Sequence, residues 1–315
     1  MRKTILTLTA LLLNLLNAGA QQTDAYPYPS VPDTLRTPET RAMYVMEHYW
    51  DRFDFADTTL VNRPEITEQG FANFLDLLPR VKPATAATGL TALATHLYNI
   101  KADKKTAELM RNYFEEIADK YLGDTESPLH NDLLYAQYID AMTANKFASV
   151  ADRTRGEYMA RNLRKNLPGS VAADFQYTDR NGVTHSMHSF NATYTLLYFY
   201  DPDCDHCQEV KAELADMPQL KEGTTFRVLA IFPYDDAERW KRVKPDFPAS
   251  WTDGVSPEGK ITTDDIYYIK TMPSLYLLDS EKRVILKNPD IKLLKETLSQ
   301  LRVESYKECV SKVRT

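Results

Sequence analysis

The chain has 315 residues, and its 38 lysines and arginines against 44 aspartates and glutamates give a formal net charge of −6 at pH 7. This acidic balance argues against a nucleic-acid partner, because phosphate backbones select basic surfaces. Three cysteines are too few for a disulfide-rich scaffold. The length suits one or two domains, each with an ordinary hydrophobic core.

The first twenty residues have the pattern of a secretory signal peptide. Arg2 and Lys3 precede a mostly apolar run at 5–16, and the small residues at 18–20 read A-G-A. The apolar run is shorter than the roughly 20 residues that a membrane-spanning helix needs. We therefore expect cleavage near Ala20 (1–20 being the signal peptide), export to the periplasm, and a mature chain without a transmembrane segment.

The residues after the leader favour a linker and then a helical domain. Three prolines in residues 21–36 predict an extended linker. In residues 37–167 apolar side chains recur at steps of three and four, the period of an amphipathic helix. Thr37 followed by Pro38 is typical of a helix start. Further helices are expected around 71–78, 84–98, 103–122, 130–145 and 149–166.

The texture changes at the turn sequence L-P-G-S of residues 167–170. Apolar runs bounded by charge or proline then alternate with helix-like segments, which is typical of an α/β domain with buried strands. We expect this domain to occupy residues 168–303 and a polar tail to occupy 304–315. The expected strands are 194–200, 226–232 and 274–278, and the expected helices are 207–216, 235–244 and 290–302.

The sequence Cys204-Asp205-His206-Cys207 lies between an expected buried strand and an expected helix. Cys204 would lie at the helix N-terminus, where free backbone N–H groups stabilise a thiolate, the attacking species in disulfide exchange. His206 adds a nearby donor. The residues alone leave three readings open: redox chemistry, a metal site and a structural disulfide. Negative charge that opposes a thiolate comes from Asp201, Asp203 and Asp205.

Several segments of residues 168–303 match the pattern of a known group of proteins: Ala172 to Phe175, Leu196 to Tyr200, Cys204, Cys207, Arg227 to Phe232, and Pro273. Through them, residues 168–303 resemble the exported thioredoxin-like proteins of the TlpA/ResA/AhpC-TSA group. This resemblance implies a central mixed sheet flanked by helices and a Cys204–Cys207 disulfide in which Cys204 attacks and Cys207 resolves. It also implies that Pro273 is a cis-proline beside the pair, with Met272 and Thr271 binding the substrate.

The chain departs from the pattern of that group around the cysteines. Asp203 replaces the usual tryptophan, and His206 replaces the usual proline. The two positions where relatives carry a proton-accepting acid are occupied by Tyr198 and Val210. Candidate replacements for that acid are Glu209 and Glu213.

The first half also resembles a known domain. With the sequence FDFADTTLVNRPEITEQGFANFLDLLP at residues 53–79, the chain around residues 40–165 is similar to the DUF5106-like helical domain of unknown function that precedes thioredoxin-like domains in exported Bacteroidetes proteins. This resemblance implies an architecture of a helical domain followed by an α/β domain, and it implies no chemistry for the helical half.

The hypothesis is an exported thiol–disulfide oxidoreductase without metal or cofactor. Its partners would be protein thiols or disulfides in the cell envelope, together with an upstream redox partner. One alternative is an envelope binding module in which the cysteine pair is a structural disulfide. Another is a thiolate metal carrier that uses Cys204, Cys207 and His206. Cys309 is either a spare surface thiol or a third redox partner.

Overall fold

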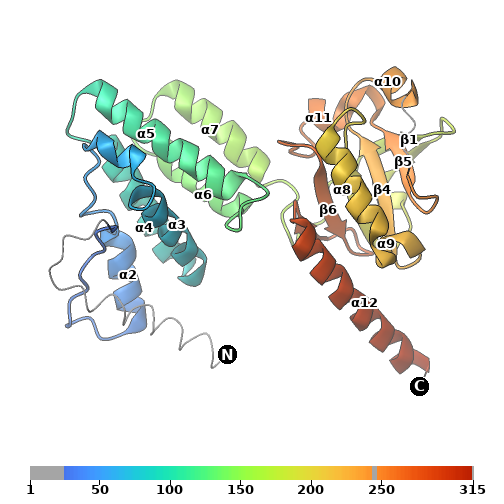
Figure 1. The fold of residues 1–315 in the computed structure, drawn as a ribbon, viewed down its shortest axis with the longest axis horizontal. Coiled ribbons are helices and arrows are strands. Elements are labelled where there is room, and N and C mark those ends of the chain that lie inside the picture. Colours follow the sequence, from blue (N-terminus) through green and yellow to red (C-terminus); the bar gives the residue numbers. More distant parts are fainter. Residues whose placement is uncertain (1–24, 243–246, 314–315) are drawn as a thin grey trace. The chain divides into compact units, whose positions relative to one another are not determined.

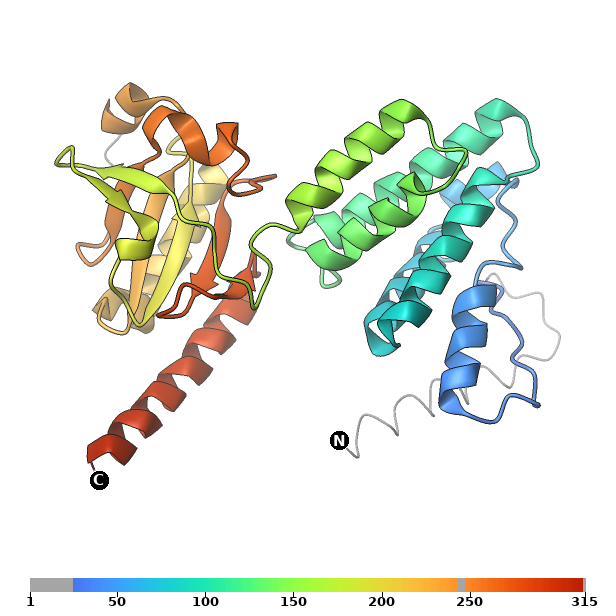
Figure 2. The ribbon, with the colours of Figure 1, turned by 180° about the vertical axis from the view of Figure 1, so that it is seen from behind.

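The computed structural model describes residues 25–242 and 247–313, with side chains up to residue 303. The expected signal peptide therefore lies outside the described residues. The chain forms two compact units, Met1–Ala160 and Arg161–Thr315. Figures 1 and 2 show the two units as ribbons from opposite sides.

The first unit is built from helices, as the sequence predicts. Thr37 caps the first of them, because its hydroxyl accepts a hydrogen bond from the backbone N–H of Thr40. Asp103 and Asn131 cap two later helices in the same way. The elements are α2 (Pro38–His48), η1 (Thr58–Asn62), α3 (Thr67–Leu77), η2 (Leu78–Arg80), α4 (Pro83–Tyr98), α5 (Lys104–Ala118), η3 (Asp119–Gly123), α6 (Asp132–Thr143) and α7 (Val150–Leu163).

Aromatic side chains form the core of the helical unit around the buried Trp50. The segment expected as a linker contributes to this core. Residues 25–36 contain no helix or strand, but Tyr26 is buried and its hydroxyl donates to the carbonyl oxygen of Tyr49 at 2.7 Å. The ring of Tyr26 also occupies the space beside Gly70 on α3 that a side chain at this position would fill. The beginning of the described chain is thus part of the helical fold.

The second unit contains a seven-stranded mixed sheet, which confirms the expected α/β architecture. Strands β3, β4 and β5 are parallel, and the other pairs are antiparallel. The sequence predicted the three long buried strands, β3, β4 and β6. The order is β2 (Thr184–Ser186), β1 (Gln176–Asp179), β5 (Thr252–Val255), β4 (Phe226–Phe232), β3 (Tyr194–Phe199), β6 (Ser274–Leu278) and β7 (Val284–Lys287).

Alternating side chains on β3 and β4 create two cores, one on each face of the sheet. On β3, Leu196 and Tyr198 face one core, whereas Leu197 and Phe199 face the other. The first core is covered by α8 (Asp205–Asp216), α9 (Pro218–Glu222), α10 (Ala237–Arg242) and α12 (Ile291–Val313). The second contains Ile261 of α11 (Lys260–Thr263), which directly follows η5 (Pro257–Gly259), and Met187 of η4 (Met187–Ser189).

The C-terminal helix is longer than expected. It was expected at 290–302, whereas α12 continues to Val313 and so includes most of the segment expected as a polar tail at 304–315. Its sequence has no proline or glycine after Pro289 to stop it. The side chain of Cys309 lies outside the described residues.

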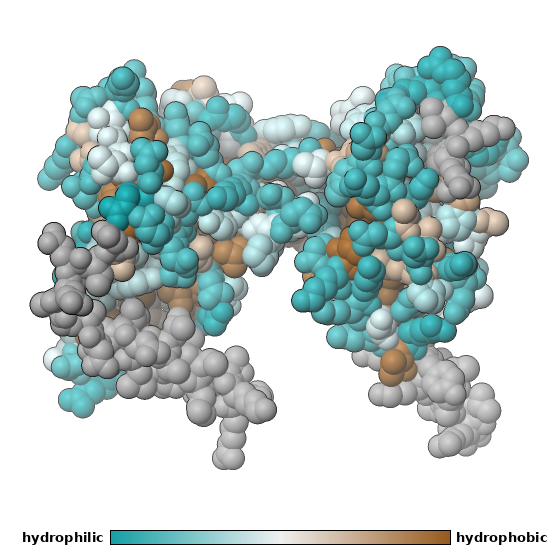
Figure 3. All heavy atoms as spheres, viewed as in Figure 1, coloured by the Kyte–Doolittle hydropathy of each residue, from teal (hydrophilic) through white to brown (hydrophobic). Residues whose placement is uncertain are grey.

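The surface of the described residues is largely hydrophilic in the view of Figure 3. Among the described helices, none combines the length and the apolar character needed to cross a bilayer.

A substitution at Gly70 tests the packing of Tyr26. In Gly70→Ala the new Cβ would overlap the Tyr26 ring, so we expect the helical unit to lose about 1–3 kcal/mol of unfolding free energy. In a Tyr26→Ala background the same change should be neutral or stabilising, because alanine favours helix over glycine by about 1 kcal/mol. Hydrogen exchange of the α3 amides measures both effects. Equal losses in the two backgrounds would contradict this packing.

Candidate active site

The loop between β3 and α8 carries the two cysteines. Asp201 shapes this loop: its carboxylate accepts from the backbone N–H of Asp203 at 2.9 Å, and its carbonyl oxygen accepts from that of Cys204 at 3.2 Å. Cys204 is then the N-cap of α8, and its Sγ accepts from the backbone N–H of Cys207 at 3.1 Å. A sulfur in this position lies at the positive end of a twelve-residue helix, which favours its anionic form.

The two sulfurs have different environments. Cys204 is half-buried, whereas Cys207 is fully buried in the core beside Val210 and Leu214. Burial raises the pKa of the Cys207 thiol, and the nearby Cys204 and the Asp201 carboxylate raise it further, while a backbone hydrogen bond at Asp201 acts in the opposite direction. Cys207 therefore stays protonated at neutral pH, and nucleophilic chemistry falls to Cys204.

The loop before β6 lies against Cys204. The peptide bond between Met272 and Pro273 is cis, and the Cys204 thiol donates to the Met272 carbonyl oxygen at 3.8 Å. Sheet register explains this meeting, because Phe199 at the end of β3 pairs with Ser274 at the start of β6. The structure thus brings together the sequence-predicted residues Cys204, Cys207, Met272 and Pro273. Thr271 is exposed next to them.

The side chain of His206 is exposed, and its Nδ1 lies 3.4 Å from the carboxylate of Glu209. Glu213, the other candidate proton acceptor, pairs with Lys295 at 3.3 Å. Both glutamates therefore lie on the exposed side of α8, opposite to the buried Cys207.

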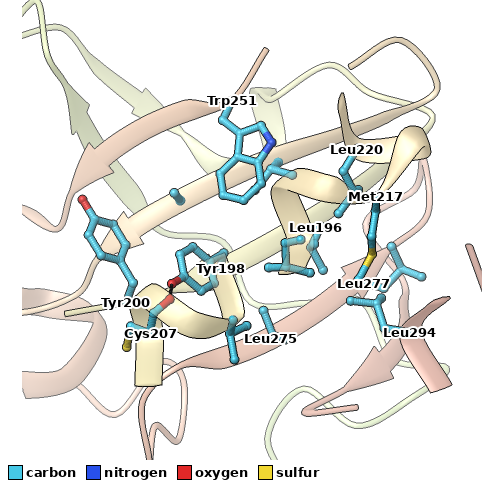
Figure 4. Close-up of a cluster of buried hydrophobic side chains, with 14 of the residues drawn as sticks. Leu196, Tyr198, Tyr200, Cys207, Met217, Leu220, Trp251, Leu275, Leu277 and Leu294 are labelled. Carbon is cyan, nitrogen blue, oxygen red and sulfur yellow. Dashed lines mark hydrogen bonds between the residues drawn. The ribbon is translucent and has the colours of Figure 1, made fainter. Parts of the chain in front are cut away.

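Tyr198 lies at one of the two positions where the resemblance implies a proton-accepting acid. Strand alternation turns its side chain toward α8, and its hydroxyl donates to the Cys207 carbonyl oxygen at 2.5 Å (Figure 4). The tyrosine therefore holds the first turn of α8 and supplies no negative charge to the sulfur. Val210 is buried and apolar. The charge of the Asp201 carboxylate contributes to the raised pKa of Cys207.

Sequence reasoning missed Arg239, which lies on α10. Its guanidinium binds the carboxylates of Asp201 and Asp203, which precede Cys204 in the same loop. No spacing pattern links residue 239 to a motif 35 positions earlier, and the basic residues of the predicted helix at 235–244 look alike in the sequence. Only the packing of α10 against the sheet reveals which one reaches the site.

The structure contains Cys204 and Cys207 as free thiols, the reduced form of the pair. The expected disulfide between them stays a prediction about the oxidised form. Within residues 25–242 and 247–303, no group of three or more histidine, cysteine, aspartate or glutamate side chains is arranged to hold a metal ion.

In a comparison with known protein families, each half of the chain matches a family model. A family model for a domain of unknown function (DUF5106) matches residues 7–166, and one for a thioredoxin-like domain matches residues 189–289. The crystal structure of a thioredoxin-like protein from Bacteroides caccae is 31% identical, with a TM-score of 0.71, and the match covers 89% of this chain and 99% of that chain. Among curated proteins no match was found.

Two further solved structures match less than half of the chain. A conserved protein of unknown function from Bacteroides fragilis is 38% identical, with a TM-score of 0.40, over 42% of this chain and 98% of that chain. The thioredoxin domain of a thiol-disulfide oxidoreductase from Bacteroides vulgatus is 20% identical, with a TM-score of 0.39. The match covers 43% of this chain and 97% of that chain.

The resemblance expected from the sequence is confirmed by the two family models and by the Bacteroides caccae structure. The chain belongs to the family of proteins in which a DUF5106 domain is followed by a thioredoxin-like domain.

Proposed function

We propose that this protein is an exported thiol–disulfide oxidoreductase that exchanges electrons with protein substrates of the cell envelope. The observation that carries this proposal is the unequal pair of sulfurs. A half-buried Cys204 caps a helix next to the Met272–Pro273 loop, and a sealed, protonated Cys207 lies one helical turn behind it. This arrangement suits a two-step exchange on a substrate that reaches only the first sulfur.

In the reducing direction the Cys204 thiolate attacks one sulfur of a substrate disulfide. A mixed disulfide forms, and the other substrate sulfur leaves as a thiolate that takes up a proton. Cys207 then attacks the Cys204 sulfur, its own proton passes to the departing substrate sulfur, and the Cys204–Cys207 disulfide forms. Two electrons and two protons have moved to the substrate. An upstream dithiol partner restores the reduced pair, and the same steps in reverse oxidise a substrate.

The raised pKa of Cys207 orders these two steps. A protonated thiol is a poor nucleophile, so Cys207 does not compete with Cys204 for the substrate. In the mixed disulfide Cys204 carries no charge, so one of the influences that raise the Cys207 pKa is removed. Resolution is therefore favoured only after the substrate has bound covalently.

The half-buried Met272 and the exposed Thr271 form the surface next to Cys204. We assign them to substrate positioning, with Pro273 holding the backbone beside the sulfur. His206 is exposed beside Cys204 and is assigned to tuning the pair. Export is proposed from the leader at 1–20, with the periplasm as the site of action.

Single cysteine substitutions test the assigned order. In a Cys309→Ser background, Cys204→Ser should abolish reduction of insulin disulfides, because no attacking sulfur remains. Cys207→Ser should also lose turnover but accumulate a mixed disulfide with the substrate, visible on a non-reducing gel and by mass spectrometry. Full activity in the Cys204→Ser variant would refute the proposal.

Alkylation as a function of pH tests the difference between the two thiols. In the reduced, folded Cys309→Ser protein, iodoacetamide should label Cys204 well before Cys207 up to pH values near the ordinary thiol pKa of about 8.5. The sign follows from burial, which raises the Cys207 pKa and keeps this thiol protonated. In urea both cysteines should react at similar rates. Mass spectrometry of the labelled peptides measures this, and equal labelling in the folded state would contradict it.

A further inference from the structure

Three carboxylates lie close to Cys204 along the chain. Asp201 and Asp203 lie three and one residues before the cysteine, and Asp205 follows it. A carboxylate close to a sulfur opposes the formation of a second negative charge there. The favourable helix N-terminus acts on Cys204 against this opposition, so the balance depends on what neutralises the carboxylates.

Arg239 contacts two of these carboxylates at once. Its Nη2 and Nη1 donate to the two oxygens of Asp201 at 2.6 and 3.2 Å, which is a bidentate pair. Its Nη2 and Nε donate to one oxygen of Asp203 at 2.6 and 2.9 Å. The Asp201 side chain is only 20% exposed and that of Arg239 27%, so solvent screens this pair less than an ordinary surface ion pair.

The position of Arg239 is fixed from outside the cysteine loop. Its backbone N–H donates to the carboxylate of Asp236 at the start of α10. Its guanidinium lies 5.6 Å from the centre of the Phe232 ring on β4. The next residue, Trp240, is buried and donates to Asp253 on β5 at 3.1 Å. Contacts of α10 with the sheet therefore fix the position of the guanidinium, and the carboxylates of the cysteine loop bind to it there.

We propose that Arg239 is a positioning residue of the cysteine site, which holds the loop of Asp201 and Asp203 in place and cancels negative charge that would oppose a thiolate at Cys204. The inference rests on the proposed function, because it assigns Arg239 to the reactivity of the attacking sulfur. Two carboxylates and one guanidinium leave one net negative charge where there would be two. Other charged or titratable groups around the pair are Asp205, His206 and Glu209 on α8, Tyr198 on β3, and Tyr234 after β4.

Charge-neutral replacements test the proposal without a substrate. In reduced Cys309→Ser protein, Arg239→Gln should slow alkylation of Cys204 at pH 7 by about threefold or more and move its rate–pH profile to higher pH, since the carboxylates are then uncompensated. The alkylation rate of Arg239→Lys should lie between those of the protein with Arg239 and of Arg239→Gln, because a lysine keeps the charge and loses the bidentate geometry. Lys241→Gln is the matched control: it removes the same charge from α10, and Lys241 pairs with Glu238 on its own helix.

A compensating variant separates charge from loop folding. Asparagine keeps an oxygen that can accept from the backbone N–H of residue 203, so Asp201→Asn preserves the turn. Asp201→Asn and Asp203→Asn added to Arg239→Gln should restore the alkylation rate to at least the wild-type value, because the wild-type cluster keeps one net negative charge and the triple variant keeps none. An unchanged rate in Arg239→Gln, an equal slowing in Lys241→Gln, or no restoration in the triple variant would each overturn the proposal.

These outcomes are distinct from a failure of the proposed function. Wild-type protein that fails to reduce insulin would refute the oxidoreductase, whereas alkylation reports the Cys204 sulfur alone. If both hold, Arg239→Gln should also slow insulin reduction, and the triple variant should recover it.

Discussion

The hydrogen bond from the Cys207 backbone N–H to the Cys204 sulfur is the contact on which the site depends. It makes Cys204 the cap of α8, at 3.1 Å, so the reactive atom is also the group that begins the helix. A helix N-terminus stabilises a nearby negative charge by about 0.3–1 kcal/mol at exposed positions. The same geometry turns Cys207 into the core, where burial keeps its thiol protonated. One local structure therefore produces two thiols with different roles.

The sheet determines what this pair can contact. Parallel β3 delivers the cysteine loop at its C-terminal end, and antiparallel β6 starts at the same edge, which places the Met272 carbonyl beside Cys204. Alternation along β3 sends the Tyr198 hydroxyl to the first turn of α8. Because the stabilisation by the helix terminus is modest, nearby charges can have an effect of similar magnitude on the Cys204 thiolate. Arg239 matters for this reason, since it compensates part of the negative charge of the carboxylates near the sulfur.

Much of the architecture was predictable because it follows from local patterns of apolar and polar residues in the sequence. Continuous apolar runs marked β3, β4 and β6, and helical periodicity marked the first unit. Four-residue strands such as β5 and β7 carry too little pattern to be recognised, and the burial of Tyr26 depends on a glycine 44 residues later. The cysteine motif and Pro273 were identified from the sequence. Arg239 was not, because its role arises from tertiary packing between α10 and the loop.

The midpoint potential of the cysteine pair tests the central claim most directly. Equilibration of the Cys309→Ser protein in thiol–disulfide buffers, read by mass spectrometry of alkylated samples, gives this value. The account predicts a reversible two-electron transition between Cys204–Cys207 dithiol and disulfide at a potential above about −300 mV. A potential below that value would indicate a structural bond, and the absence of any Cys204–Cys207 disulfide would equally contradict the account.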